Sequence, residues 1–193
     1  MNKTINWGII GCGKVTEYKS GPAFQKVEGS KLVAVMRRDA ALAEDYARRH
    51  NVPKWYHDAD KLIHDKEVNA IYVATPPGNH AEFAIQAMRA GKPVYVEKPM
   101  AATYQQCQDM LQVSRETGVP LFVAYYRRTL PGFNKVKTLI EDGNIGKPLV
   151  VNIMLVRPAS EAEANTDNPP WRVDPDLAGG GIFYDLASHQ LDY

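Results

Sequence analysis

The stretch GIIGCGKVT, residues Gly8–Thr16, decides the fold of this chain. It joins an apolar run at 5–10, typical of a buried strand, to a helix expected to end near residue 27. Gly11 permits a tight turn, and Gly13 lets the backbone approach a pyrophosphate at the N-terminus of that helix. Thr16 replaces the third glycine of the dinucleotide-binding fingerprint, so we expect the helix and the strand to lie slightly further apart. The pattern predicts a dinucleotide site, and the alternative is a turn that needs glycine only for its shape.

Short apolar strands alternate with helices through the first 124 residues. Strands are expected at 5–10, 31–36, 53–56, 70–74, 93–97 and 121–124. Further helices are expected at 40–50, from 58, from Asn79 to Gly91 and from Thr103 to Gly118, the last two with capping boxes completed by Glu82 and Gln106. This alternation predicts an α/β, doubly wound parallel sheet, so we interpret residues 1–124 as a dinucleotide-binding Rossmann domain.

Residues 125–193 follow a different pattern. A helix is expected at 131–143, a long strand at 148–157, a loop at 158–176 and a short helix after the triple glycine Gly179–Gly181. The strand is apolar on both faces, which is typical of a strand with neighbours and cover on each side, yet this region supplies no second strand. We therefore interpret 125–193 as the beginning of an α+β open-sheet domain that is incomplete within this chain.

Composition restricts the class of protein. The 193 residues include 23 basic and 22 acidic side chains, and the net charge of +1 gives no case for a nucleic-acid partner. The charge is uneven, because residues 1–157 have a net charge of +7, which suits an anionic ligand, and 158–193 have −6. The two cysteines, Cys12 and Cys107, favour a reducing compartment. Without an apolar signal core or an apolar run long enough for a membrane span, the sequence predicts a cytoplasmic protein with no membrane partner.

The residues after the second strand indicate which dinucleotide is preferred. An NAD-selective site has Asp or Glu there to accept a hydrogen bond from the ribose 2′-hydroxyl, whereas this sequence has Arg37 and Arg38. A guanidinium can form two hydrogen bonds with a 2′-phosphate and can stack on adenine. We therefore expect NADP to be preferred over NAD. The alternative is that both arginines only solvate the strand end while Asp39 caps the next helix.

Two further motifs carry groups for acid–base chemistry. Lys98, within Glu97-Lys98-Pro99, follows the fifth strand at the sheet edge where ligands bind, and it can donate to a substrate hydroxyl or carbonyl. Asp185 and His189 are four residues apart on one helix face, so the carboxylate can orient the imidazole for general acid–base catalysis. The same spacing could hold a metal, but no third ligand is evident and we predict no metal site. Taken singly, such a lysine or such a pair is more often structural.

The order of the motifs along the chain is more specific than any one of them. It comprises the glycine turn, Thr75-Pro76-Pro77 with Asn79-His80, Glu97-Lys98-Pro99, Tyr125-Tyr126-Arg127-Arg128, Trp171-Arg172, and Gly179-Gly180-Gly181 with Asp185 and His189. In this order and spacing the whole chain resembles the Gfo/Idh/MocA oxidoreductase family, which contains glucose–fructose oxidoreductase and inositol dehydrogenase.

The resemblance implies a Rossmann domain and then an α+β domain whose open antiparallel sheet often packs against a partner subunit, so we expect a homo-oligomer if the full-length chain exists. It implies hydride transfer between a nicotinamide and a hydroxyl-bearing carbon of a small sugar or cyclitol substrate. Lys98 matches the family's active-site lysine, and its peptide bond to Pro99 is often cis there. Asp185 and His189 match the residues that bind the reacting hydroxyl and move its proton. The residues expected to contact the NADP or NAD cofactor are Gly11, Gly13, Lys14, Val15, Arg37, Arg38, Thr75, Pro76, His80, Glu97, Lys98, Arg128, Trp171 and Arg172.

Two other functions stay open at this point. One is a glycoside hydrolase that uses bound NAD for transient oxidation, a chemistry found in the same family, and the other is a non-catalytic dinucleotide sensor. Arg37 in place of an acid argues against the first, and the presence of Lys98 and His189 argues against the second. Family members run well beyond position 193, so we expect residues 1–193 alone not to be a functional enzyme, although residues 1–124 could fold and bind NADP.

Overall fold

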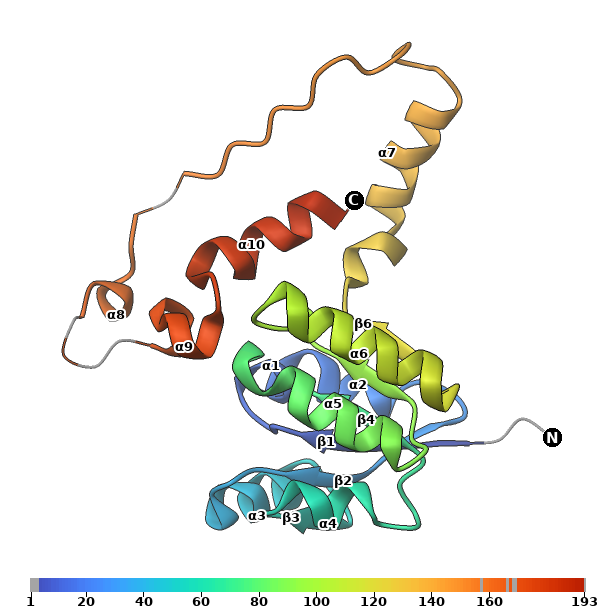
Figure 1. Ribbon diagram of the computed structural model, residues 1–193, viewed down its shortest axis with the longest axis vertical. Coiled ribbons are helices and arrows are strands. Elements are labelled where there is room, and N and C mark those ends of the chain that lie inside the picture. The colour runs from blue at the N-terminus through green and yellow to red at the C-terminus, as the bar shows by residue number, and fades with distance from the viewer. Residues whose placement is uncertain (1–3, 157, 166, 168–169, 193) are drawn as a thin grey trace. The chain divides into compact units, whose positions relative to one another are not determined.

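The computed structural model describes residues 4–156, 158–165, 167 and 170–192. The chain divides into two compact units, Met1–Ala124 and Tyr125–Tyr193 (Figure 1). The first unit is built on a single sheet, and the described residues of the second contain helices and turns but no strand. The boundary between the units therefore falls directly after the last strand of the sheet.

Six strands form the sheet of the first unit, in the order β3-β2-β1-β4-β5-β6, and every neighbouring pair is parallel. The direction in which strands are added reverses between β1 and β4, so the carboxyl ends of these two strands border the crevice where doubly wound sheets bind ligands. The predicted doubly wound α/β fold is confirmed. The strands are β1 (Ile5–Ile10), β2 (Ser30–Met36), β3 (Lys54–Tyr56), β4 (Ala70–Val73), β5 (Val94–Val96) and β6 (Leu121–Val123).

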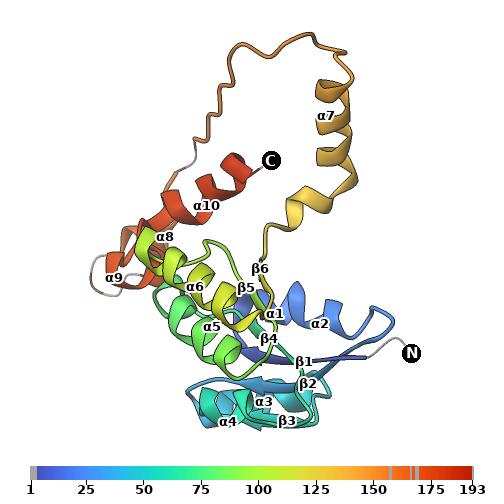
Figure 2. The ribbon, with the colours of Figure 1, turned by 45° about the vertical axis from the view of Figure 1, so that its right-hand side comes forward.

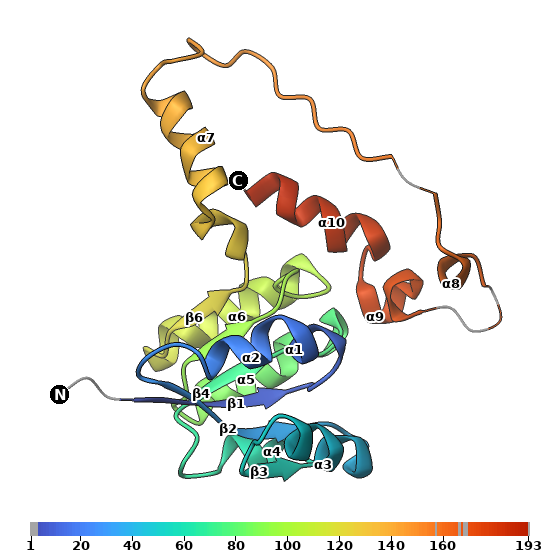
Figure 3. The ribbon, with the colours of Figure 1, turned by 180° about the vertical axis from the view of Figure 1, so that it is seen from behind.

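Helices cover both faces of this sheet. Ile9 and Ile10, adjacent in β1, belong to two different buried cores, because successive side chains of a strand point to opposite faces. In Figure 1, α5 and α6 lie in front of the strands. In Figure 3, where the first unit is seen from behind, α1 and α2 lie in front of the strands. Figure 2 shows strands between these two pairs of helices. The helices over the Ile10 core are α4 (Ala59–Ile63), α5 (His80–Arg89) and α6 (Tyr104–Thr117), and those over the Ile9 core are α1 (Lys14–Tyr18), α2 (Ser20–Phe24) and α3 (Ala40–Arg49).

The helix predicted to run from the glycine turn to residue 27 is instead two short helices, α1 and α2. The break follows from two residues at the start of α2. A Cβ atom on Gly21 would lie 2.3 Å from the carbonyl oxygen of Thr16 and 2.4 Å from the hydroxyl of Tyr46, so the chain passes α3 too closely for any side chain. Pro22 has no N–H group with which to continue α1. The prediction of one continuous helix is therefore wrong.

One of the two predicted capping boxes is present. The Thr103 hydroxyl accepts from the N–H of Gln106 at 3.2 Å, and the Gln106 side chain accepts from the N–H of Thr103 at 3.2 Å, at the start of α6. The box predicted at Asn79 is wrong, because a 3-10 turn, η1 (Pro77–Asn79), precedes α5 and Asn79 makes no capping hydrogen bond. Asn79 has φ −105° and ψ −1°, whereas a capping side chain needs an extended backbone to reach the helix amides.

The long strand predicted at 148–157 is absent from the described residues 148–156, which Figure 1 shows as coil. Large apolar side chains of this segment are exposed on both faces, from 51% at Ile153 to 85% at Leu149. A strand needs a hydrogen-bonded neighbour, and the described part of the second unit offers none. The prediction is therefore wrong over 148–156, and Arg157 lies outside the described residues.

The rest of the second unit is helical. The helices predicted at 131–143 and after the triple glycine are confirmed as α7 (Pro131–Glu141) and α10 (Gly181–Asp192). The loop predicted at 158–176 is partly wrong, because its described residues include short helices. The shorter elements of this unit are η2 (Tyr126–Thr129), α8 (Glu161–Ala164), η3 (Trp171–Val173) and α9 (Pro175–Ala178).

Candidate functional site

The glycine turn lies between the carboxyl ends of β2 and β4. The N–H groups of Gly11 and Cys12 donate to the carbonyl oxygen of Met36, at 2.9 and 3.1 Å. Gly11 has a φ of +95°, and a Cβ atom there would lie 2.8 Å from the backbone nitrogen of Thr75, so only glycine fits. A Cβ atom on Gly13 would have its nearest contact at 3.9 Å, with the carbonyl oxygen of Gly11. The space beside Gly13 is therefore open, as a site for a phosphate group requires.

The backbone after this turn provides hydrogen-bond donors. α1 begins at Lys14, and the N–H of Thr16 is the first in it to donate within the turn, to the carbonyl oxygen of Gly13 at 3.0 Å. The N–H groups of Lys14 and Val15 precede this bond, and donors in that position bind pyrophosphate in doubly wound folds. The open space and these donors fit a dinucleotide.

Two threonines border the turn and differ in their hydrogen bonding. Thr16, in place of the third glycine, is fully buried and its hydroxyl donates to the carbonyl oxygen of Gly13 at 2.8 Å. The wider spacing of helix and strand expected from Thr16 stays a prediction. The hydroxyl oxygen of Thr75 is buried and has no hydrogen-bond partner among the described residues. A buried hydroxyl without a partner is costly, so Thr75 marks a place where a polar atom of a ligand completes the site.

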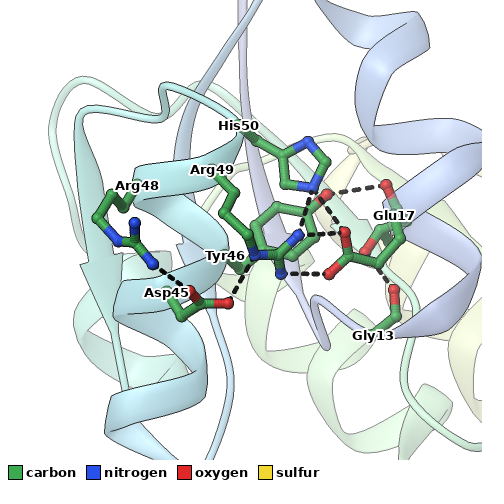
Figure 4. Close-up of polar contacts among 8 residues, drawn as sticks. Gly13, Glu17, Asp45, Tyr46, Arg48, Arg49 and His50 are labelled. Atoms are coloured by element: carbon green, nitrogen blue, oxygen red, sulfur yellow. Dashed lines mark hydrogen bonds and ion pairs between the residues drawn. The ribbon is translucent and has the colours of Figure 1, made fainter.

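A network of charged side chains fixes α3 against α1 (Figure 4). Arg49 forms two hydrogen bonds with the carboxylate of Glu17 in α1, at 2.6 and 2.8 Å, and one with Asp45 at 2.6 Å. Nε2 of His50 lies 2.7 Å from the same Glu17 carboxylate. The hydrogen bonds from Arg49 hold the pKa of Glu17 at about 2, against the opposing effect of burial. The helix that starts at the glycine turn is thus tied to the helix that follows the predicted arginine pair.

Arg37 and Arg38 follow β2 directly and are exposed. Burial raises the pKa of the Cys12 thiol, in the glycine turn, to about 11, and the positive charge of Arg37 opposes that rise. Arg37 directly follows Met36, whose carbonyl oxygen accepts the N–H groups of Gly11 and Cys12, so its backbone adjoins the glycine turn.

Asp39, which follows Arg37 and Arg38, caps the next helix, as the alternative interpretation of this segment predicts. Asp39 caps α3 by accepting a hydrogen bond from the N–H of Leu42 at 3.0 Å. Capping by Asp39 leaves both arginines available, because among the described residues neither Arg37 nor Arg38 forms an ion pair, in contrast to Arg49. Helix capping by Asp39 is thus compatible with binding of a 2′-phosphate by the two arginines.

The Glu97-Lys98-Pro99 turn follows β5 at the same edge of the sheet. The N–H of Glu97 donates to the carbonyl oxygen of Val73, the last residue of β4, at 2.9 Å. The peptide bond between Lys98 and Pro99 is cis, as the resemblance implies. The Tyr72 hydroxyl donates to one carboxylate oxygen of Glu97, and the N–H of Lys98 donates to the other at 3.2 Å. The half-buried Lys98 is therefore held beside the end of the strand that borders the glycine turn.

His80, which is expected to contact the cofactor, is buried between the loops that follow β4 and β5. It is buried, with 1% of its surface exposed, whereas the preceding Pro76 is half-buried. Nδ1 of His80 lies 2.9 Å from the carbonyl oxygen of Pro99, and Nε2 lies 2.7 Å from that of Thr75. Burial lowers the pKa of His80, and the two carbonyl groups act in the opposite direction. Both ring nitrogens of His80 therefore face the backbone of two loops, and its contact with the cofactor stays a prediction.

Within the second unit, α10 presents two carboxylates to arginines. Asp185 accepts a hydrogen bond from Arg172 at 3.1 Å, and the Arg172 guanidinium lies 4.5 Å from the centroid of the Trp171 ring. Asp192, with a side chain only 4% exposed, forms an ion pair with Arg128. The structure thus places Arg128, Trp171 and Arg172 against one helix.

His189 lies one turn after Asp185 in α10 and is 5% exposed. The rings of Tyr125 and Tyr126 meet its imidazole edge to face, with centroid distances of 6.2 and 5.5 Å. The predicted acid–base residue is therefore buried, with two tyrosine rings against its imidazole.

Sequence reasoning misses two residues that shape the site of the first unit. Tyr72 lies in a strand of four buried residues, and a buried tyrosine hydroxyl needs a partner, so its presence was an available signal. Glu17 gives no such signal, because its partner Arg49 is 32 residues away in the chain.

Two kinds of feature are absent from the described residues. No helix among them is both long and apolar enough to cross a membrane. Nor do they contain a group of three or more His, Cys, Asp or Glu side chains arranged to hold a metal ion.

Comparison with known proteins assigns the chain to a family. Residues 5–125 match the family described as "Oxidoreductase family, NAD-binding Rossmann fold", and residues 133–193 match the "GFO/IDH/MocA C-terminal domain". The chain is 42% identical over 192 residues to Oxidoreductase P35 of Formosa agariphila, a match that covers 100% of this chain and 60% of that protein. It is 30% identical over 192 residues to scyllo-inositol 2-dehydrogenase (NAD(+)) of Bacillus subtilis, covering 100% of this chain and 53% of that protein.

A solved structure of a reductase shares the fold of most of this chain. The 3-ketoreductase KijD10 from Actinomadura kijaniata, in complex with NADP and TDP-benzene, matches with a TM-score of 0.69 and 27% identity. That match covers 73% of this chain and 43% of the solved chain. The present chain thus spans 60% or less of the length of each of these three proteins.

Proposed function

Because the chain belongs to the Gfo/Idh/MocA oxidoreductase family, we propose that it serves an NADP-preferring enzyme that transfers hydride between the nicotinamide and a secondary alcohol or ketone of a sugar-like or cyclitol substrate. The observation that carries the proposal is the Glu97-Lys98-Pro99 turn. It places a half-buried lysine at the carboxyl end of β5, beside the strand that borders the glycine turn. A homo-oligomer and a cytoplasmic location stay predictions.

The preference for NADP is proposed from this chain's own residues, since the relatives include a protein named for NAD(+) and a structure solved with NADP. Arg37 and Arg38 are exposed after β2 and form no ion pair within the described part of the chain. Arg37 directly follows Met36, whose carbonyl oxygen accepts two hydrogen bonds from the glycine turn. A 2′-phosphate bound beside the turn would accept hydrogen bonds from this guanidinium.

In the proposed mechanism, His189 transfers the proton of the substrate hydroxyl, and Lys98 stabilises the negative charge on the substrate oxygen. The bound nicotinamide supplies the hydride acceptor or donor. During oxidation, His189 takes the proton of the substrate hydroxyl, and Asp185, one helical turn earlier, favours the imidazolium that forms. The ammonium group of Lys98 stabilises the negative charge that develops on the substrate oxygen. During reduction, His189 returns the proton.

Cofactor preference is tested by titrating NADPH and NADH into the intact chain and following nucleotide fluorescence. We expect NADPH to bind more tightly, and Arg37→Gln to weaken NADPH binding about ten-fold or more, since a charge-assisted hydrogen bond contributes about 1.5–3 kcal/mol. The matched control is Arg48→Gln, which removes the same charge from an arginine that binds Asp45. Equal affinities for the two nucleotides at moderate salt would contradict the NADP preference.

Catalysis is tested on the longest chain that the reading frame encodes, with NADP⁺ and either scyllo-inositol or myo-inositol, by absorbance at the NADPH wavelength. His189→Ala should lower turnover by roughly 10²–10⁴ and leave NADPH affinity almost unchanged. The exposed His57, changed to Ala, serves as the control. Near-normal turnover of the His189→Ala enzyme would move the base role to another residue.

A further inference from the structure

We propose that Tyr72 and His80 are positioning residues that hold the Lys98 turn from the two faces of the sheet. The proposal rests on the role of Lys98 proposed above. Tyr72 belongs to the core under α1, α2 and α3, whereas His80 is the first residue of α5 on the opposite face. Neither residue is assigned to substrate contact, and each acts on the backbone that carries the lysine.

Tyr72 fixes the residue before Lys98. Its side chain is fully buried, and its ring stacks on Tyr95 at 5.3 Å and meets the edge of Phe24 at 5.2 Å, so the hydroxyl has little freedom. Burial, together with the nearby Glu97 carboxylate, raises the pKa of Tyr72, which keeps the hydroxyl protonated as a donor. The hydroxyl donates to one oxygen of Glu97, and the other oxygen accepts the N–H of Lys98. Tyr72 therefore orients the carboxylate that binds the Lys98 backbone.

His80 fixes the residue after Lys98. Its Nδ1 faces the carbonyl oxygen of Pro99 at 2.9 Å, and its Nε2 faces the carbonyl oxygen of Thr75 at 2.7 Å. A carbonyl group can only accept and a neutral imidazole carries one N–H, so His80 donates a hydrogen bond to one of the two carbonyl groups and contacts the other. His80 thus links the loop after β5 to the loop after β4, and Thr75 in that loop lies directly against Gly11 of the cofactor turn.

The two contacts together define where the amine of Lys98 can go. With Glu97 held by Tyr72 and Pro99 held by His80, the Lys98 backbone is fixed on both sides. Catalytic groups act efficiently when neighbouring residues restrict them to the productive geometry, and a displacement of about 1 Å can cost about 10²-fold in rate.

The test is spectroscopic and needs neither cofactor nor substrate. The lysines of the intact chain are dimethylated with ¹³C-formaldehyde, and the methyl resonance of Lys98 is assigned by its absence in Lys98→Arg. Tyr72→Phe, which keeps the buried ring and removes one hydroxyl, and His80→Gln should each shift or broaden the Lys98 resonance. Tyr95→Phe, in the neighbouring ring, and His57→Gln, at an exposed histidine, should leave it unchanged.

A purely structural role would lower the thermal midpoint of both variants while the Lys98 resonance stays in place, and that result would overturn the proposal. If His80→Gln fails to fold, Tyr72→Phe decides the outcome by itself. Failure of the proposed function is a separate result, in which Lys98→Met of the longest chain turns over scyllo-inositol with NADP⁺ as fast as the parent. In the longest chain, Tyr72→Phe should lower turnover about 10- to 100-fold.

Discussion

Two apolar segments of similar composition have opposite environments in the two units. Residues 70–73 form β4, where hydrogen bonds to β1 and β5 leave every residue buried. Residues 149–156 are also apolar apart from Asn152, yet their large apolar side chains are 51–85% exposed and no strand pairs with them within the described residues. Hydrophobicity therefore determines burial only where neighbouring strands belong to the same compact unit.

The largest expected difference comes from placing one charge in each segment. Ile71→Lys puts an ammonium group into the fully buried centre of β4 and should reduce the free energy of unfolding by more than about 4 kcal/mol, or prevent folding. Val151→Lys, at a position 77% exposed, should change it by less than about 0.5 kcal/mol. Urea unfolding followed by circular dichroism measures both. Similar losses for the two variants would show that residues 149–156 are buried after all.

A methyl group added at a glycine should have opposite effects in the two units. Gly21→Ala forces a Cβ atom against Thr16 and Tyr46 and should cost about 2–3 kcal/mol. Gly132→Ala, in α7, meets nothing within 4 Å and should stabilise that helix by about 0.5–1 kcal/mol. Denaturant unfolding gives the first value and helical circular dichroism the second. A neutral Gly21→Ala would mean that α1 and α3 can separate without loss.

Acid should weaken the first unit through the carboxylate shown in Figure 4. The pKa of Glu17 falls from an ordinary 4.5 to about 2 on folding, so its contribution is complete above pH 4.5 and disappears as the pH falls towards 2. Because Arg49 is 42% exposed, we expect this contribution to be about 1–2 kcal/mol. Glu17→Gln should remove that part of the pH dependence, measured as unfolding midpoints between pH 2 and 5.

The matched control is Glu141→Gln in α7, whose carboxylate is 63% exposed and 3.7 Å from Lys137. It should leave the same pH dependence unchanged. An unaltered slope in the Glu17→Gln variant would mean that other carboxylates cause the acid sensitivity.

The smallest difference should come from the two capping boxes. Thr103→Ala removes the cap of α6, which packs on the sheet, and should cost about 1 kcal/mol, whereas Thr103→Ser should restore most of it. Ser160→Ala removes the equivalent cap of α8, a helix of four exposed or half-exposed residues, and should not change global unfolding. Thermal unfolding midpoints of the three variants provide the measurement, and a loss at Ser160 as large as that at Thr103 would be inconsistent with this contrast.

The parts of the molecule that could be predicted are those governed by neighbours in sequence. Five of the six strands were predictable as short apolar runs between turn residues, β3 (Lys54–Tyr56) was predictable from the aromatic pair after Pro53, and the position of Lys98 follows from its place after the fifth strand. Contacts between distant residues could not be predicted, such as Glu17 with Arg49 or His80 with the Pro99 carbonyl. The strand expected at 148–157 failed for the same reason, since its pattern is local but pairing is not.

The strand order of the first unit also has a kinetic meaning during synthesis. If the strands pair in the order of their synthesis, β2 adds to β1, β3 to β2, β4 to the other side of β1, β5 to β4 and β6 to β5. Each new strand thus meets a free edge, and none has to insert between two strands already paired. Among the pairs of neighbouring strands, β1 and β4 are the furthest apart in sequence, and closing a longer loop costs more chain entropy. The nucleotide crevice, formed by the ends of these two strands, therefore depends on the pairing that closes the longest loop in the sheet.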